Sequence, residues 1–180
     1  MKAPADTVLI AQVLILHSQR AFGQLVERYQ SPIRRFFLNQ TCGDKALSDD
    51  LSQETFIKAY TGLKNFQGAA NFQTWLYRIA YNVFYDYIRS RKDEDDIDTI
   101  EADARYSEEQ SDAGKTMDIY RAMQQLSKDE RTCITLFYME DKQIKQIADI
   151  TGMAEGTIKS HLSRGKDKMA KYLKENGYGQ

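Results

Sequence analysis

One helix-length segment combines aromatic rings with polar groups of the kinds that bind nucleic acid. Residues 71–92, NFQTWLYRIAYNVFYDYIRSRK, hold seven of the chain's aromatic side chains, which number 8 Phe, 11 Tyr and 1 Trp in all. Rings can stack on unpaired bases, amides can hydrogen-bond base edges, and cations can hold phosphates. The segment is therefore either an over-filled core helix or, on one side, a surface for bases and phosphates.

A rotation of about 100° per residue separates this segment into two helical stripes. The first is apolar and should face the core: Phe72, Leu76, Ile79 and Val83, with Ala80, Tyr87 and Ile88 at its margins. The second, which we call the polar stripe, consists of Asn71, Trp75, Arg78, Asn82, Tyr85 and Arg89. With Gln67 in the loop before it, the polar stripe predicts a surface for an unpaired strand. The alternative is that Trp75 and Tyr85 simply pack against a neighbouring helix.

A second candidate surface lies near the C-terminus, where a short helix, a turn and a longer helix are expected. The first helix runs from about Lys142 to Ile150 and the second begins near Glu155. Ala148 is small where the helices would cross, and Gly152 allows the left-handed backbone of the turn. A shared core is expected from Ile147, Met153, Ile158 and Leu162. This spacing is typical of a DNA-binding helix-turn-helix.

The charge of this segment supports the same interpretation. Residues 142–174 carry eight basic and three acidic side chains, a net charge of +5. Side chains of the second helix that point away from its core could contact base edges and phosphates in a major groove. They are Thr157, Lys159, Ser160, His161, Ser163, Arg164 and Lys168. For His161, simple exposure to solvent is an equally good interpretation.

The remaining chain supplies helices that would position these surfaces. Only 2 Pro and 10 Gly occur in 180 residues, and apolar residues recur mostly at three- and four-residue spacing, so we predict an all-α protein. Helices are expected over 18–39, with a kink or boundary at Pro32, and over 44–60. The second should bury Leu47, Leu51, Phe56, Ile57 and Tyr60. Ser127 and Glu130 can form a capping box at the start of another helix.

An acidic segment divides the chain. Residues 93–112 carry ten acidic side chains against Arg105 alone, a net charge of −9. Such a segment gains too little from burial to offset its ordering entropy. We therefore predict two small helical domains, 1–92 and 115–180, joined by a flexible acidic linker, 93–114.

Composition excludes several classes of function. The net charge of −1 points to no particular partner. Cys42 and Cys133 have no metal-ligand or redox spacing, and His17 and His161 are isolated from them, so we expect reduced thiols, no metal and no cofactor. The apolar run 8–16 is too short to span a bilayer and predicts a core-packing first helix in a cytoplasmic protein.

Four motifs in this order, AFGQLVERYQ, DDLSQETFIKAY, FQTWLYRIAYN and EGTIKSHLSRGKDKM, resemble those of a bacterial RNA polymerase sigma factor. The resemblance is to the extracytoplasmic-function (ECF, group 4) members of the sigma-70 family and covers about residues 22–173. It implies a subunit that is not an enzyme, brings RNA polymerase to promoters and helps to open the strands. Sigma region 2 would precede the acidic linker, and sigma region 4 would follow it.

The resemblance also implies roles for particular residues. Docking on the coiled coil of the largest core polymerase subunit would use Asp50, Leu51, Gln53, Glu54 and Phe56. In that docking, Leu51 and Phe56 would be the apolar anchors. The loop 63–71, with Gln67, and the polar stripe would capture a flipped base of the minus-ten element, with Asn82 and the loop nearest the base. Region 4 would dock on the flap of the second large subunit and place its recognition helix in the minus-thirty-five element.

The sequence departs from the family's pattern in places. Ala154 stands where a capping oxygen is common, so the recognition helix should have a weaker N-terminus. The start of the preceding helix, in EDKQI, is unusual, and the tyrosines of residues 71–92 include candidates for packing.

Other classes of function stay open at this point. One is a stand-alone helix-turn-helix regulator with a helical sensor or dimerisation domain. A helical metal hydrolase using His17 is a weaker alternative, because no paired ligand spacing supports it. For a sigma factor we expect promoter DNA and core polymerase as partners, no membrane insertion, and in many relatives an anti-sigma factor that can hold the protein at the membrane.

Overall fold

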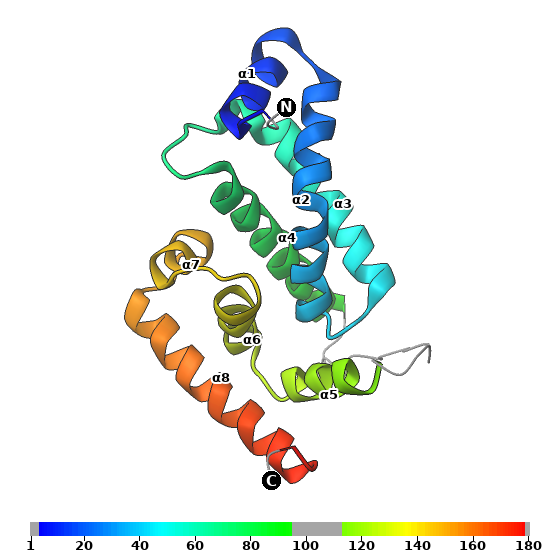
Figure 1. Ribbon diagram of the computed structural model, residues 1–180, viewed down its shortest axis with the longest axis vertical. Coiled ribbons are helices and arrows are strands. Elements are labelled where there is room, and N and C mark those ends of the chain that lie inside the picture. Colours follow the sequence, from blue (N-terminus) through cyan, green and yellow to red (C-terminus); the bar gives the residue numbers. More distant parts are fainter. Residues whose placement is uncertain (1–3, 95–112, 179–180) are drawn as a thin grey trace.

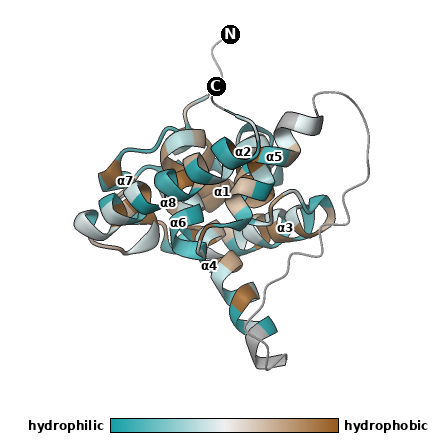
Figure 2. Ribbon diagram, turned by 90° about the horizontal axis from the view of Figure 1, so that it is seen from below, coloured by the Kyte–Doolittle hydropathy of each residue, from teal (hydrophilic) through white to brown (hydrophobic). Residues whose placement is uncertain are grey.

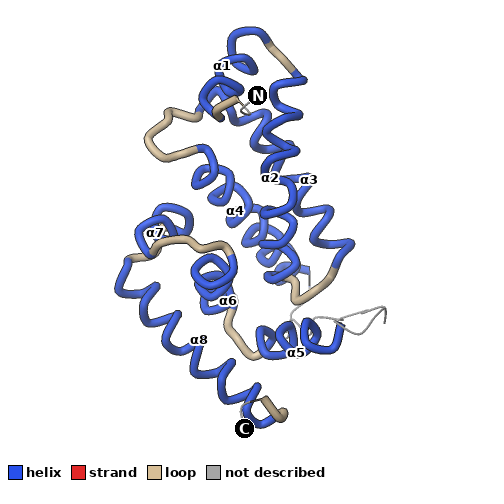
Figure 3. The backbone as a smooth tube through the Cα atoms, in the orientation of Figure 1, coloured by secondary structure: helices blue, strands red, loops and turns tan. Residues whose placement is uncertain are grey.

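The computed structural model describes residues 4–94 and 113–178, and every regular element in these ranges is helical, which confirms the all-α prediction (Figures 1 and 3). The N-terminal half contains α1 (Asp6–Leu16), α2 (Gln19–Gln40), α3 (Lys45–Gly62), a 3₁₀ turn (Leu63–Asn65) and α4 (Phe72–Glu94). The C-terminal half contains α5 (Ala113–Gln124), α6 (Lys128–Ile134), a π-helical turn (Thr135–Met139), α7 (Ile144–Thr151) and α8 (Glu155–Glu175). Most of the predicted linker, 93–114, lies outside the described residues. No helix in the described ranges has the length and apolarity needed to cross a membrane.

In the N-terminal half, α2, α3 and α4 pack against one another and α1 packs on α2. Two of these helices begin at polar side chains that accept a backbone N–H. The Ser18 hydroxyl accepts from Ala21 at 3.2 Å, and Asp44 accepts from Leu47 at 2.9 Å. Such caps satisfy donors that have no partner inside the helix. Helix α1 buries Leu9, Ile10 and Val13 in the same core.

Helix α2 continues through Pro32, so of the kink or helix boundary predicted there, the boundary is wrong. Proline lacks an N–H and its ring crowds the preceding turn, which costs stability in a helix interior. Tertiary packing outweighs that cost, because Ile33, Phe36 and Phe37 after the proline and Leu25 before it are all completely buried. Both segments of α2 are thus fixed to one core.

The buried face of α3 differs from the predicted one. Leu51 is buried, whereas Ile57 is 63% exposed and Tyr60 is 43% exposed. The core-facing positions are instead largely small and hydroxylated: Ser48, Ser52, Thr55 and Ala59. Ser52 donates to the Ser48 carbonyl at 2.7 Å and Thr55 to the Leu51 carbonyl at 2.8 Å, which satisfies their hydroxyls inside the helix. Of the other predicted positions, Leu47 and Phe56 are partly buried against the core, so the prediction is wrong for Ile57 and Tyr60 only.

In the C-terminal half, the predicted capping box at the start of α6 is confirmed. The Ser127 N–H donates to Glu130 Oε2 at 2.9 Å, and the Glu130 N–H donates to Ser127 Oγ at 3.3 Å. After α6, the chain makes the π-helical turn and passes through Asp141 with a positive φ of 50°. Helix α7 then begins at Ile144, two residues later than predicted. Figure 2 shows hydrophilic and hydrophobic residues alternating along the helices, as amphipathic elements require.

The two halves pack against each other. Helix α4 contacts α7, and α2 contacts α6 and the π-helical turn. Buried residues of both halves belong to one continuous cluster, from Leu9 in α1 to Leu162 in α8. The polar contacts across this boundary include residues of the polar stripe.

Candidate nucleic-acid interface

The polar stripe lies on one side of α4, with Asn82 and Arg89 exposed on the helix and Gln67 exposed in the loop before it. Asn71 precedes the helix, and its Oδ1 accepts the Thr74 N–H at 2.8 Å. That bond uses the oxygen of the Asn71 amide and leaves its nitrogen for other contacts. Gly68 in the loop has a φ of 70°, which a residue with a side chain would adopt only with strain.

Both aromatic side chains of the stripe are partly packed. Trp75 lies against Phe66 and Phe72, with ring centroids 5.3 and 5.7 Å away, so it ties the loop to α4. Tyr85 stacks on Tyr81 at 4.2 Å, and its hydroxyl donates to Asp129 Oδ1 of α6 at 2.5 Å. Burial and this hydrogen bond to Asp129 raise the pKa of Tyr85, so its hydroxyl stays protonated as a donor. Each of these two aromatic side chains is therefore partly buried by packing against its neighbours, as the alternative interpretation expected.

Arg78 is bound to the C-terminal half. Its Nε donates to the Asp149 carbonyl at 2.8 Å, and its Nη2 donates to the same oxygen. Asp149 lies in the last turn of α7, where carbonyls lack partners inside the helix and attract cations. The structure therefore leaves Asn82, Asn71 and Gln67 exposed, together with Arg89, whose Nη2 lies 3.8 Å from Asp86 Oδ1. It places Arg78 and Tyr85 against the other half.

Helix α3 carries the residues predicted to dock on polymerase. Asp50, Gln53 and Glu54 are exposed, Phe56 is half-buried, and Leu51 is in the core at 3% exposure. Leu51 therefore holds α3 in place and is not available as an anchor, which corrects that part of the prediction. Ile57, four residues after Gln53 and three after Glu54, is the exposed apolar residue on this face. Sequence periodicity would have found it once Leu51 was assigned to the core.

The helix-turn-helix forms from α7 and α8 as predicted. Gly152 has a φ of 76°, and its N–H donates to the Ala148 carbonyl at 2.8 Å, which closes α7. Ala154 precedes α8 and supplies no side-chain cap, as the sequence indicates. The shared core contains Ile147, Ile158 and Leu162 as buried residues and Met153 as a partly buried one.

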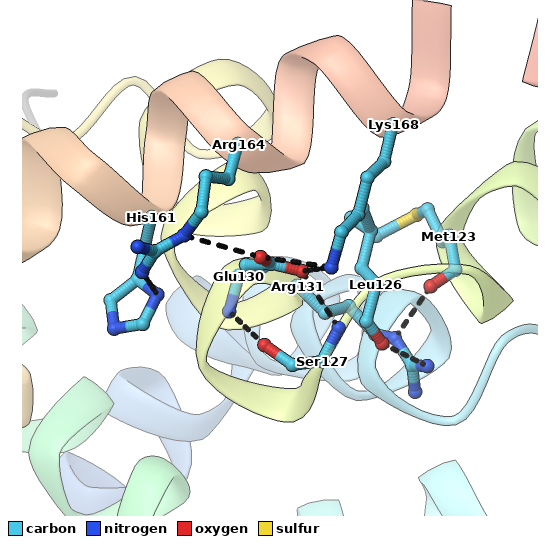
Figure 4. A network of polar contacts seen from close by, with 8 residues as sticks. All are labelled: Met123, Leu126, Ser127, Glu130, Arg131, His161, Arg164 and Lys168. Carbon is cyan, nitrogen blue, oxygen red and sulfur yellow. Dashed lines mark hydrogen bonds and ion pairs between the residues drawn. The ribbon is translucent and has the colours of Figure 1, made fainter. Parts of the chain in front are cut away.

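The predicted base-reading side chains of α8 differ in their exposure and in the contacts that they make within the protein. Thr157, Lys159, Ser160 and Ser163 are exposed, and His161 is half-buried. The Ser160 hydroxyl donates to the Gly156 carbonyl at 3.0 Å, and Arg164 Nη2 lies 3.2 Å from His161 Nδ1. Arg164 and Lys168 also belong to a network with α6 (Figure 4).

That network centres on Glu130, whose side chain is 4% exposed. Lys168 Nζ lies 2.8 and 3.1 Å from its two carboxylate oxygens, and Arg164 Nε lies 3.6 Å from Oε1. Burial tends to raise the pKa of Glu130, but the hydrogen bonds from Lys168 and Ser127 outweigh it, so the pKa lies below its ordinary value. Lys168 is thus held on α6, while Arg164 is the more exposed of the two, at 59%. Only the capping role of Glu130 was predicted from the sequence.

A close approach between helices accompanies this network. A Cβ at Gly165 would lie 2.9 Å from Ile134 Cγ1, so only glycine fits where α8 crosses α6. The orientation of α8 on α6 therefore depends on Gly165 of α8 and on Glu130 of α6.

The chain matches two family models, Sigma-70 region 2 over residues 25–94 and Sigma-70 region 4 over residues 116–169. It is 33% identical to the ECF RNA polymerase sigma-E factor of Escherichia coli K12, over 90% of this chain and 91% of the relative. It is 30% identical to the ECF RNA polymerase sigma factor SigW of Bacillus subtilis, over 87% of this chain and 91% of the relative. It is also 32% identical to the RNA polymerase sigma-H factor of Pseudomonas aeruginosa, over 86% and 87%.

Solved structures agree. The sigma factor RpoE of Bartonella quintana, crystallised with the anti-sigma factor NepR, superposes with a TM-score of 0.69 at 28% identity, covering 85% of this chain and 96% of that one. CnrH, solved with the cytosolic domain of CnrY, shares the fold with a TM-score of 0.74 at 23% identity, covering 97% and 100%. The chain therefore belongs to the ECF sigma factors of the sigma-70 family, which direct promoter-specific initiation of transcription by RNA polymerase.

Proposed function

We propose that this chain is a detachable, non-catalytic subunit in which three surfaces divide the work of initiation. The exposed face of α3, with Asp50, Gln53, Glu54 and Ile57, docks on the coiled coil of the largest core subunit. The carboxylates and the amide suit a basic partner, and Ile57 supplies the apolar contact. RNA synthesis itself is carried out by the polymerase.

The second surface is the polar stripe with its loop, which reads the minus-ten element as an unpaired strand. Extruding a base costs a few kcal/mol, and stacking on aromatic rings returns about 1 to 3 kcal/mol per base. Asn82, exposed in the middle of α4, is placed to hydrogen-bond a base edge, and Arg89 to hold a phosphate. The partly packed Trp75 supports the loop that would close over the extruded base.

The third surface is the N-terminal part of α8, which enters the major groove of the minus-thirty-five element. Thr157, Lys159, Ser160 and Ser163 are exposed there, away from the core formed by Ile158 and Leu162. Hydrogen bonds to base edges would give sequence discrimination, and the basic side chains would bind phosphates. Arg164 would exchange Glu130 for a phosphate, whereas Lys168 acts mainly by fixing α8 on α6.

The exposed face of α3 is the observation that favours this proposal over a stand-alone helix-turn-helix regulator, because such a regulator would not need a surface for docking on polymerase. A pull-down with core polymerase, followed by run-off transcription from the bacterium's own promoters, tests it. Retention by core and new transcripts that depend on the added chain are expected. Tight binding to duplex DNA without any binding to core would support the stand-alone regulator instead.

Initiation would take place in the cytoplasm, where polymerase and promoter DNA are found, and on the nucleoid once the chain is bound to polymerase. An anti-sigma factor is a further proposed partner, supported by the similar RpoE, which was crystallised with one. Purification of the chain with its bound proteins from its native cell would identify such a partner.

A further inference from the structure

His161 and Arg164 form a hydrogen-bonded pair one turn apart on α8, next to α6 (Figure 4). Arg164 Nη2 lies 3.2 Å from His161 Nδ1. An arginine side chain has only N–H donors and no acceptor, so Arg164 donates and Nδ1 accepts. The contact therefore requires a neutral imidazole whose proton is on Nε2. His161 thus offers Arg164 an acceptor, and not a positive charge.

A second group holds the same guanidinium from α6. Arg164 Nε lies 3.6 Å from Glu130 Oε1, too far for a hydrogen bond but within the range of an ion pair. Lys168 already donates to both oxygens of that carboxylate, at 3.1 and 2.8 Å. Glu130 would therefore keep a paired cation if Arg164 moved away, and no buried charge would be left alone. Of the two contacts of Arg164, the one to His161 is the closer and the one to Glu130 is the easier to give up.

The rest of the Arg164 side chain is available to DNA. It is 59% exposed, and its Nη1 has no partner among the residues that the structure describes. A guanidinium can donate two parallel hydrogen bonds to O6 and N7 of a guanine, or bind a phosphate. The bidentate contact needs a fixed guanidinium plane, and a free arginine loses side-chain entropy when DNA fixes it. A partner that holds the plane before DNA arrives reduces this loss.

His161 itself is less suited to contact DNA than its neighbours are. It is half-buried, whereas Lys159 and Ser163 are exposed. His161 lies three residues before Arg164 and seven before Lys168, so these three side chains leave the helix on one side. Lys168 on that side is bound to α6. His161 is therefore on the side of α8 that meets α6.

We propose that His161 is a positioning residue for recognition of the minus-thirty-five element. Its Nδ1 holds the Arg164 guanidinium in the orientation that reads a base edge, and it keeps this hold when Arg164 leaves Glu130 for DNA. This inference rests on the proposed function, in which Arg164 contacts that element. It gives His161 an indirect role in discriminating between sequences, in place of the direct contact predicted from the sequence.

The pair can be tested in the free chain, because the protein has only two histidines, His17 and His161. Long-range nitrogen–hydrogen NMR spectra of nitrogen-15-labelled histidine distinguish a protonated ring nitrogen from a bare one. At about pH 8 a histidine side chain is ordinarily neutral. His17→Gln identifies the signals of each ring.

The His161 signals should show a proton on Nε2 and none on Nδ1. In Arg164→Ala, they should move toward the signals of His17, which is exposed. A proton on Nδ1 of His161, or signals that do not change in Arg164→Ala, would overturn the pair.

The consequence for recognition is measured with the chain bound to core polymerase. The two probes are a promoter that this chain transcribes in run-off assays and the same promoter with the bases of its minus-thirty-five element scrambled. His161→Leu should reduce the ratio of the two affinities by about threefold to tenfold, because DNA alone must then order Arg164. Binding to the scrambled promoter should change by less than about twofold, since phosphate contacts carry no sequence information.

Two further substitutions separate the acceptor from side-chain size and from charge. His161→Gln is close in size to His161→Leu but keeps an acceptor oxygen, so it should retain most of the parent's preference. His161→Lys supplies a cation and no acceptor, so it should lose the preference although its charge strengthens binding to both duplexes. Circular dichroism should show the same helix content in all variants. If His161→Gln is as defective as His161→Leu, or if His161→Lys discriminates as well as the parent, the role of Nδ1 is overturned.

The dependence on Arg164 is the last part of the test. Arg164→Ala alone should lower the preference, and His161→Leu added to it should lower it no further, because His161 acts through Arg164. An additional loss in the double variant would mean that His161 contacts DNA directly, and would overturn the positioning role. A parent chain that binds no core polymerase would contradict the proposed function, while the NMR measurement, which needs neither polymerase nor promoter, would still decide the pair itself.

Discussion

Lys168 of α8 donates to the Glu130 carboxylate of α6 across a helix interface, with Nζ and Oε2 2.8 Å apart. The same carboxylate accepts the Ser127 N–H that begins α6. One side chain therefore starts a helix and fixes the recognition helix upon it. The orientation of the proposed DNA-reading face of α8 therefore depends on a buried charge two helices before it in sequence.

Glu130→Gln should lower the free energy of unfolding by about 1.5 to 3 kcal/mol at pH 7, the value of a hydrogen bond to a charged group. The pKa of Glu130 is lowered in the folded protein, so its stabilising effect is complete above the unfolded pKa, near 4.3, and is lost as the pH falls through the folded value. Urea unfolding of the full chain at pH 7 and at pH 3.5 should thus show a larger difference between the variant and the parent at pH 7 than at pH 3.5. Asp167→Asn, at an exposed acid of α8, is the control. An equal loss at both pH values would mean that the carboxylate charge does not matter.

Gly165→Ala should destabilise the chain by about 1 to 3 kcal/mol, because the added methyl group would meet Ile134 at 2.9 Å. Gly23→Ala is the matched control in α2, where nothing lies within 4 Å of the added Cβ. That change should stabilise the chain by about 0.4 to 1 kcal/mol, since alanine is the better helix former. Thermal unfolding followed by circular dichroism measures both. If Gly165→Ala left the stability unchanged or raised it, the α6–α8 contact would be able to relax around the added methyl group.

The beginnings and ends of several helices could be predicted because several levels of the sequence agree. Ser127 with Glu130, Gly152 and Ala154 each have a local meaning that neighbouring residues reinforce, and the structure shows all three as expected. Pro32 gave a wrong indication, because proline by itself favours the end of a helix. The burial of Phe36 and Phe37 stabilises α2 enough for the helix to continue through it. Local chemistry prevails only where tertiary packing does not oppose it.

Contacts between the halves could not be predicted. Arg35 and Glu140 are 105 residues apart, and each looks like an ordinary exposed charge in sequence. Periodicity describes which side of a helix is apolar, but it does not say which helix covers that side. On α3, Ser48, Ser52 and Thr55 are buried with their hydroxyls bonded inside the helix, while Ile57 is exposed, and hydrophobicity alone predicts neither. Contacts between residues far apart in sequence could therefore be identified only from the structure.

Replacing Gln53 with Ala and Glu54 with Lys should weaken binding to core polymerase by at least tenfold, because a cation would face the proposed basic partner. Ile57→Ala should also weaken binding, since it removes the exposed apolar contact of this face. Circular dichroism should be unchanged, as all three side chains are exposed. Glu27→Lys, an exposed acid on α2, makes the same charge change elsewhere. If these variants bind core as tightly as the parent does, α3 is not the docking helix.

The two DNA-reading roles can be separated with one substitution each. Arg164→Ala should reduce recruitment to a promoter with an intact minus-thirty-five element by about 1 to 3 kcal/mol. On a template already opened as a mismatch bubble, with the upstream element deleted, this variant should match the parent.

Asn82→Ala should do the reverse, because Asn82 is exposed on α4 and would meet only an unpaired base. Recruitment into the closed complex should persist, while permanganate reactivity of unpaired thymines falls. Lys171→Ala removes one exposed cation of α8 beyond the predicted contacts and controls for charge alone. If Asn82→Ala and Arg164→Ala impair recruitment equally and neither affects strand opening, the polar stripe is a packing surface for the C-terminal half and not a reader of DNA.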